Sequence, residues 1–244
     1  MPGVEVVAMD LSDLDSVRSF ARGVVDRGTT IGLVINSAGV MANPLTRVGP
    51  GWESQFAINH LGHFALVDLL MPAFDTGGAR VVSVSSGAHA ISPIRWDDIH
   101  FTRREYDPWV AYGQSKTANV LFAVQLDSVG RSLGVRAFSV QPGSIITPLQ
   151  RHIPRDQQIE MRWIDGDGVP SPEFKTPAQG AATAVWAATS PLLEGRGGEY
   201  CEDCDIAPLA KEGAPGGVAA WAIDTDSANE LWAYSADATR AKVN

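Results

Sequence analysis

The sequence predicts an α/β fold in which a parallel sheet carries helices on both faces. Continuous apolar runs at 31–35, 80–84 and 135–140 alternate with segments whose apolar residues recur at helical spacing. This alternation is typical of strand–helix–strand units joined by right-handed crossovers. Each run also ends in small or polar residues, and ligands of such sheets bind at the carboxyl ends of the strands.

In the first half of the chain, short apolar runs and capping residues predict the elements. The runs 4–9 and 31–35 are rich in β-branched residues, which is typical of strands, and the second lacks polar alternation, as in a strand covered on both faces. Ser12 and Asp15 resemble the start of a capped helix. The elements predicted here are strands at 4–9, 31–35 and 80–84 and helices near 14–25 and 52–70.

In the second half, helical spacing begins at Tyr112 and fades before Gly130. Residues 147–177 are rich in Pro, Asp and Arg without a period, which predicts a long loop or a lid. No repeat or change of composition marks a boundary, so we expect one domain over 1–244. The further predicted elements are helices at 112–126, 178–189 and 227–238 and strands at 135–140 and 198–202.

Composition and charge exclude several classes of function. The 244 residues include 19 basic and 28 acidic side chains without a basic patch, which argues against nucleic-acid binding. No apolar run reaches the ~18–20 residues of a membrane span, and no signal peptide is seen, so we expect a cytoplasmic protein. Cys201 and Cys204 lack further ligands nearby and are expected to be free thiols rather than a redox or zinc pair.

Tyr112 and Lys116 are one helical turn apart and would therefore point into the same space. A phenol has an ordinary pKa of about 10, and a nearby ammonium favours its ionised form. The pair would then exchange protons nearer neutrality. The alternative is two surface residues that are neighbours by chance. The strand ends, which would meet along one edge of the sheet, favour a site: Asp10, Asn36-Ser37-Ala38-Gly39, Ser85-Ser86 and Pro142-Gly143.

Two other interpretations of the polar residues are weaker. Ser86 with His89 suggests a hydrolase, but the Gly-x-Ser-x-Gly nucleophile elbow is absent. His60 and His63 are three apart on a predicted helix, as two metal ligands could be. No acid or cysteine at ligand spacing completes a metal site, so a packed or surface pair is expected.

The ordered motifs resemble one known family. They are Asp10-Leu11, Asn36-Ser37-Ala38-Gly39, Asn59 within Asn59-His60-Leu61-Gly62-His63-Phe64, Val84-Ser85-Ser86, Tyr112-x-x-x-Lys116, and Pro142-Gly143 followed by Thr147. Over nearly its whole length the chain resembles a short-chain dehydrogenase/reductase. The stretch from Tyr106 to Phe122 and the ending Gly197-Gly198-Glu199-Tyr200 look like the retinol-dehydrogenase-like branch. The resemblance implies a Rossmann-like sheet and an oxidoreductase.

The resemblance implies roles for four catalytic residues. Tyr112 would be the general acid/base at the substrate oxygen, and Lys116 would lower the pKa of Tyr112 and hold the nicotinamide ribose. Ser86, the second serine of its pair, would hydrogen-bond the substrate oxygen. Asn59 would hold a water in the proton relay. Hydride would move to or from the cofactor while Tyr112 moves the proton.

The same resemblance implies a nicotinamide cofactor, NADP or NAD, with NADP preferred. Asp10 would bond the adenine, and Leu11 would lie beside it. Asn36, Ala38 and Gly39 would lie alongside the ribose of the cofactor. Tyr112 and Lys116 would also contact the cofactor, and its nicotinamide end would meet Pro142, Gly143, Ile145 and Thr147.

The sequence departs from the family at its beginning. The family opens with a strand, a Thr-Gly-x-x-x-Gly-x-Gly turn that holds the pyrophosphate, and a second strand and helix, whereas this chain starts at what resembles the third strand. We expect Met1 to be an internal methionine of a longer chain that lacks its first two strands and helices here. In a genuine short form, 4–9 would pair with 31–35 or leave an open strand edge.

Two classes of function therefore remain. One is the oxidoreductase, acting on a small, partly apolar carbonyl or alcohol beneath the 147–177 lid. The other is a non-catalytic remnant that acts only as an interaction or dimerisation module. The resemblance implies a homodimer or homotetramer that pairs the helices predicted at 52–70 and 112–126.

Overall fold

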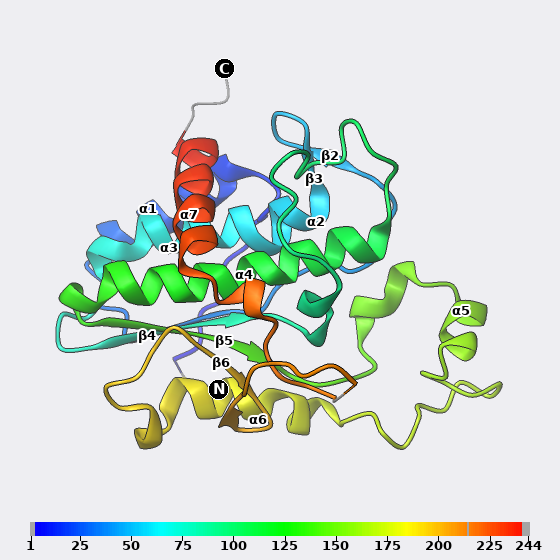
Figure 1. Ribbon diagram of the computed structural model, residues 1–244. Coiled ribbons are helices and arrows are strands. Elements are labelled where there is room, and N and C mark those ends of the chain that lie inside the picture. The colour runs from blue at the N-terminus through cyan, green and yellow to red at the C-terminus, as the bar shows by residue number, and fades with distance from the viewer. Residues whose placement is uncertain (1–2, 214, 241–244) are drawn as a thin grey trace.

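Within residues 3–213 and 215–240, which are those the computed structural model describes, five strands form the central sheet (Figure 1). Their spatial order is β1-β4-β5-β6-β7. The first four run parallel and the last pair is antiparallel. The predicted Rossmann-like sheet is confirmed. Its strands are β1 (Leu33–Asn36), β4 (Ala79–Val84), β5 (Val135–Gln141), β6 (Glu199–Glu202) and β7 (Asp205–Ile206).

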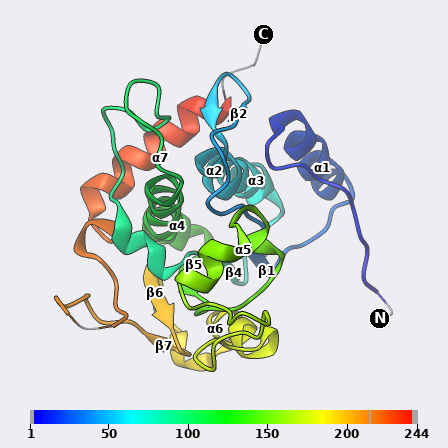
Figure 2. The same cartoon turned by 90° about the vertical axis from the view of Figure 1, so that its right-hand side faces the viewer.

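Helices cover both faces of this sheet (Figure 2). On one face lie α1 (Leu14–Asp26), α3 (Gly62–Leu70), α4 (Pro108–Gly130) and α7 (Thr225–Arg240), and α6 (Pro177–Thr189) lies on the other. The larger apolar core fills the space between the sheet and the α1–α3–α4 layer. A smaller core lies between the sheet and α6.

The helix predicted at 52–70 is interrupted. Trp52 and Glu53 form β3 (Trp52–Glu53), which pairs with β2 (Arg47–Val48), and the helix begins with α2 (Ser54–Phe56). The Glu53 carboxylate starts this helix by accepting hydrogen bonds from the N–H groups of Gln55 and Phe56, both at 2.8 Å. A π-helical turn, η1 (Ala57–Leu61), separates α2 from α3 and is centred on Asn59. Such turns frequently mark functional positions.

Helix α4 begins earlier than predicted, at Pro108, because Asp107 caps it through the N–H groups of Trp109 and Val110. Most of α4 is buried, since the sheet lies beneath it and α7 and the short helix η3 (Gly87–Ile91) lie over it. Gly113 permits the approach of η3: a Cβ at this position would lie 2.7 Å from the carbonyl oxygen of Ala88.

The strand predicted at 4–9 is wrong. These residues form no strand in the structure, and Val6 is 92% exposed. The segment runs away from the sheet beside α1 (Figure 2). A β-branched run forms a strand only when a neighbouring strand accepts its hydrogen bonds. The open side of β1 therefore has no strand partner among the described residues, and Leu33 and Ile35 stay 41% and 43% exposed. Met1 and Pro2 lie outside the described residues.

Helix α7 crosses α3 and α4 on the side away from the sheet (Figure 1). The Trp232 ring stacks on Phe122 at 6.0 Å and meets Phe64 edge-on at 4.9 Å. His60 Nε2 and Ser235 Oγ, 2.7 Å apart, add a buried hydrogen bond. The helix pair through which the sequence predicts association of two copies is thus covered by α7.

The segment 147–177 forms a lobe of short helical turns beside the sheet (Figure 1), and it includes α5 (Arg155–Glu160). In the described part of the chain, every helix is too short or too polar to cross a bilayer. Cys201 is buried and Cys204 exposed, and both are free thiols as predicted.

Candidate active site

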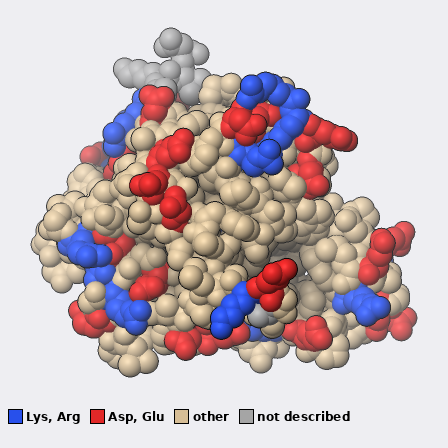
Figure 3. Space-filling view, in the orientation of Figure 1, with Lys and Arg blue, Asp and Glu red and all other residues tan. Residues whose placement is uncertain are grey.

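A cavity of about 1080 Å³ opens at the carboxyl ends of the parallel strands. Its walls come from the ends of β1, β4 and β5, the first turns of α4, the inner side of α6 and the 147–177 segment. Figure 3 shows the surface hollowed beside the α5 lobe. The structure therefore brings together three of the strand ends that the sequence predicts at one edge of the sheet, after β1, β4 and β5, but not the one at Asp10.

Tyr112 and Ser86 both line this cavity. Ser86 follows β4 and caps η3, and Tyr112 comes from α4. Only 4% of Tyr112 is exposed. Burial raises the pKa of Tyr112 to about 12, although the nearby Ser86 side chain acts in the opposite direction.

Lys116 lies beside Tyr112, but the pKa of Tyr112 is raised by burial rather than lowered as expected. The Lys116 Nζ is 5.6 Å from the Tyr112 ring centroid and donates a 2.9 Å hydrogen bond to the carbonyl of Val84. Only 5% of Lys116 is exposed, and burial lowers its own pKa to about 8. The ammonium therefore faces a strand end rather than bulk water.

Lys116→Met should remove a specific pH dependence of stability. The folded chain holds the Lys116 proton less tightly than the unfolded chain does, because the pKa falls from 10.5 to about 8. Raising the pH from 8 to 10.5 should therefore stabilise the wild type relative to the variant, by on the order of 3 kcal/mol. Urea unfolding of both proteins across this range measures the difference. Parallel stability curves would contradict the burial of an ionisable Lys116.

Asn59 links the loop after β1 to α4 through hydrogen bonds. Its side chain accepts from the N–H of Val40 at 2.8 Å and donates to the Val40 carbonyl and to Ser115 Oγ, both at 2.9 Å. Gly39 makes this packing possible, because a Cβ there would lie 2.9 Å from Asn59 Oδ1. The side chain of Asn59 is thus committed to protein partners, and its main-chain oxygen lies 3.0 Å from the ring nitrogen Nδ1 of His63.

The buried histidines have structural partners. Burial lowers the pKa of His60 to about 3 and of His63 to about 4, so both are neutral and packed. His89 Nε2 accepts from the N–H of Ala219 at 3.0 Å, and its Nδ1 lies 2.8 Å from the main-chain oxygen of Ser86. Neither nitrogen is bonded to the Ser86 hydroxyl, which argues against the hydrolase interpretation.

The residues predicted to bind the cofactor fall into two groups. The residues near Tyr112 and Lys116 line the cavity: Gly39, Pro142, Gly143, Ile145 and Thr147. The other group lies outside its lining: Asp10, Leu11, Asn36 and Ala38.

Asp10 and Leu11 lie away from the cavity because residues 4–9, which precede them, are not part of the sheet. Without a strand, Asp10 does not reach the ligand edge, and its carboxylate accepts from the N–H and hydroxyl of Ser12 at 2.8 and 2.7 Å. Leu11 packs in the core, where its carbonyl oxygen would lie 2.4 Å from a Cβ at Gly62.

The cavity has open space beside Lys116. The bare Cα of Gly39 contributes to this space, since a Cβ there would lie 3.9 Å from the Lys116 Nζ. Asn36, 2% exposed at the tip of β1, has side-chain oxygen and nitrogen atoms without a partner among the described residues. Because Asn36 lies outside the cavity lining, these atoms do not by themselves indicate a ligand in the cavity.

Several cavity residues were missed by the sequence reasoning. They are apolar and come from segments far apart in the chain, so no local pattern joins them. The missed residues include Met41, Ile91, Leu149 and Phe174.

The parallel sheet and the tyrosine, lysine and serine at its strand ends define an oxidoreductase with a Rossmann-like fold. A family model described as short chain dehydrogenase matches residues 2–158, and the chain belongs to this family.

Similar proteins agree with this assignment. A probable oxidoreductase of Streptomyces antibioticus is 48% identical over 98% of this chain and 80% of its own length. Mouse retinol dehydrogenase 12 is 38% identical over 82% of this chain and 61% of its own length. A crystal structure of an uncharacterised protein from Mycobacterium paratuberculosis superposes with a TM-score of 0.72, at 35% identity over 99% of this chain and 77% of that one.

Proposed function

We propose that the protein interconverts a carbonyl compound and an alcohol by hydride transfer with NADP or NAD, using Tyr112 as the general acid/base. The observation that carries this proposal is the placement of Tyr112 and Ser86 in the lining of one cavity, with Lys116 buried one turn along α4. Two hydroxyl groups in this position can hold one substrate oxygen between them.

In the reducing direction, the substrate oxygen lies between the hydroxyl groups of Ser86 and Tyr112. Ser86 would donate a hydrogen bond to that oxygen, and Tyr112 would give it a proton; a nicotinamide held in the cavity would supply the hydride for the carbonyl carbon. A pKa of about 12 keeps Tyr112 protonated at neutral pH, which is the form that a reduction requires.

The cofactor contacts follow from the cavity. Lys116 and Gly39 would hold the nicotinamide ribose, and the turn at Pro142 and Gly143 would contact the ring with Ile145 and Thr147. Gly143 adopts a φ of +86°, which favours glycine, and the Lys175 side chain lies directly over it.

A rival of another class remains: a module that only binds partners. The open edge of β1 favours it, because no strand among the described residues pairs with that edge. Titration of the 244-residue chain with NADPH and with NADH separates the two functions. We expect micromolar binding of at least one, and no binding at millimolar concentration would support the non-catalytic module.

A pair of glycine variants makes this titration specific to the site. Gly39→Ala places a methyl group against Asn59 and beside Lys116, so it should weaken cofactor binding at least about tenfold, or ~1.4 kcal/mol. Gly32→Ala is the control, because a Cβ there has no neighbour within 4 Å. Equal affinities of the two variants would argue that the cofactor does not lie beside Gly39.

Other features of the proposal stay predictions. We propose one domain over 1–244, with 147–177 covering the substrate, and a homodimer or homotetramer in the cytoplasm. Because α7 lies over α3 and α4, two copies would have to associate through another face or displace this helix. Light scattering after gel filtration measures the number of copies.

A further inference from the structure

Two tryptophans form an aromatic wall beside the catalytic hydroxyl groups. Trp109 lies one turn before Tyr112 on α4, and Trp163 comes from the 147–177 segment. Their rings meet edge to face, with centroids 5.9 Å apart and planes at 88°. Phe174 extends the wall, 6.1 Å from Trp163. Tyr112 belongs to the same apolar cluster as both tryptophans. A substrate whose oxygen reaches Tyr112 can therefore place an apolar group against these rings, which line the same cavity.

The charge of the cavity restricts its ligands further. Among the described residues that line the cavity, the basic side chains are Lys116 and Arg151, and none is acidic. Lys116 is buried and Arg151 is exposed at the mouth. A cationic ligand would find no counter-ion here, and it would be desolvated beside an ammonium. A neutral or anionic ligand meets no such cost.

We propose that the site takes an aromatic carbonyl substrate without positive charge, whose ring lies against the Trp109–Trp163 pair while its oxygen lies between Tyr112 and Ser86. This inference rests on the proposed function and names its substrate class. Aromatic groups gain about two- to tenfold in affinity from each edge-to-face or offset contact, beyond the contribution of buried area. An aliphatic ring of the same size would gain affinity only from the apolar area that it buries.

The test uses two pairs of ketones that differ in one property each. Acetophenone and cyclohexyl methyl ketone share a carbon skeleton and differ in aromaticity. The second pair, 4-tert-butylacetophenone and 4-acetyl-N,N,N-trimethylanilinium, shares a shape and differs in charge. Titration calorimetry measures the binding of each to the 244-residue chain, with and without NADPH. We expect acetophenone to bind at least about threefold more tightly than its saturated partner, and the neutral tert-butyl compound at least about tenfold more tightly than the cation.

Variants of the tryptophans test whether the aromatic wall causes the preference for aromatic ketones. Trp163→Leu should lower the preference for acetophenone, and the double variant Trp109→Leu/Trp163→Leu should abolish it, whereas Trp163→Phe should keep it because a ring remains. Trp221→Leu is the matched control, since Trp221 is 40% exposed and does not line the cavity. Thermal unfolding of each variant verifies that it is folded. Equal affinity for acetophenone and its saturated partner, no binding of either, or an aromatic preference that survives the double variant would overturn the inference.

The inference and the proposed function can fail separately. If the enzyme turns over small aliphatic ketones and shows no aromatic preference, the proposed oxidoreductase function stands and the proposed aromatic substrate class is wrong. If the protein binds aromatic ketones preferentially but does not turn them over with NADPH or NADH, the ligand class stands and the proposed reaction is wrong.

Discussion

Tyr112→Phe should lower the turnover of the cofactor-loaded enzyme at least about 100-fold while cofactor affinity changes little. The substitution removes the hydroxyl that would give its proton to the substrate oxygen and leaves the ring in its buried place on α4. General acid–base groups contribute about 10² to 10⁴ in rate. Single-turnover oxidation of NADPH at saturating ketone measures the loss directly.

Tyr106→Phe is the matched control for this experiment. It removes the same atom from a tyrosine that lies outside the cavity lining, where its hydroxyl contacts Glu53 Oε1 at 3.2 Å and the amide nitrogen of Gln55 at 2.9 Å. We expect Tyr106→Phe to lower stability and to leave the chemical step unchanged. Unchanged turnover in Tyr112→Phe would remove Tyr112 from its role, whatever the control shows.

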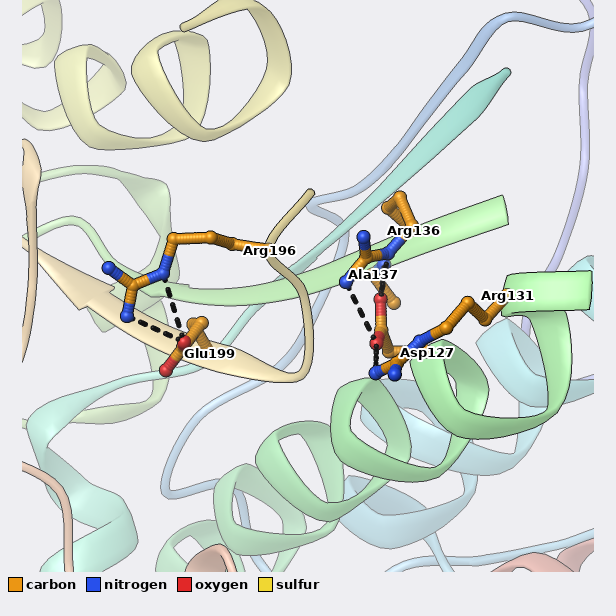
Figure 4. Close-up of polar contacts among 6 residues, drawn as sticks. All are labelled: Asp127, Arg131, Arg136, Ala137, Arg196 and Glu199. Atoms are coloured by element: carbon orange, nitrogen blue, oxygen red, sulfur yellow. Dashed lines mark hydrogen bonds and ion pairs between the residues drawn. The ribbon is translucent and has the colours of Figure 1, made fainter. Parts of the chain in front are cut away.

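Asp127→Ala should cause the largest loss of stability, about 3–5 kcal/mol. The Asp127 side chain is 2% exposed near the end of α4 (Figure 4). It accepts from Arg136 Nε at 2.7 Å, from Arg131 at 2.9 Å and from the N–H of Ala137 at 3.2 Å. Its loss would leave a guanidinium and a backbone donor unpaired where α4 joins β5. Urea unfolding at pH 7 measures the change.

The Arg196–Glu199 pair in the same view is the matched control (Figure 4). Its 2.9 Å contact is partly exposed, and such pairs contribute about 0–1 kcal/mol. Glu199→Gln should therefore change stability by less than 1 kcal/mol. Similar losses in the two variants would contradict a special role for burial at Asp127.

The pH dependence of the Asp127 effect has a definite sign. Burial alone would raise the pKa of this carboxyl, but hydrogen bonds from Arg136, Arg131 and Ala137 outweigh burial and lower it. The stabilisation is therefore present above the unfolded pKa of about 3.9 and is lost as the pH falls through the lower folded value. The difference between wild type and Asp127→Ala should shrink below about pH 4.

Much of the fold could be predicted from local patterns. The strand ending at Asn36, the helix that carries Tyr112 and the strand before Pro142 all lie within a few residues of the predicted places. Their apolar periods are properties of consecutive residues. The same reasoning failed at 4–9, because strand formation there depends on a neighbour that the described residues do not provide.

The candidate site was likewise predicted from the sequence only in part. The sequence by itself predicted that Ser86 and Gly143 lie at the carboxyl edge of the sheet, because each follows a strand, and that Tyr112 and Lys116 face one space, because they are one helical turn apart; all four line the cavity. Only the tertiary structure decided how those groups behave. Burial holds the pKa of Tyr112 at about 12, α7 covers α3 and α4, and Trp163 crosses a long stretch of sequence to meet Trp109. Desolvation and contacts between distant segments depend on how the whole chain packs, and no local pattern carries that information.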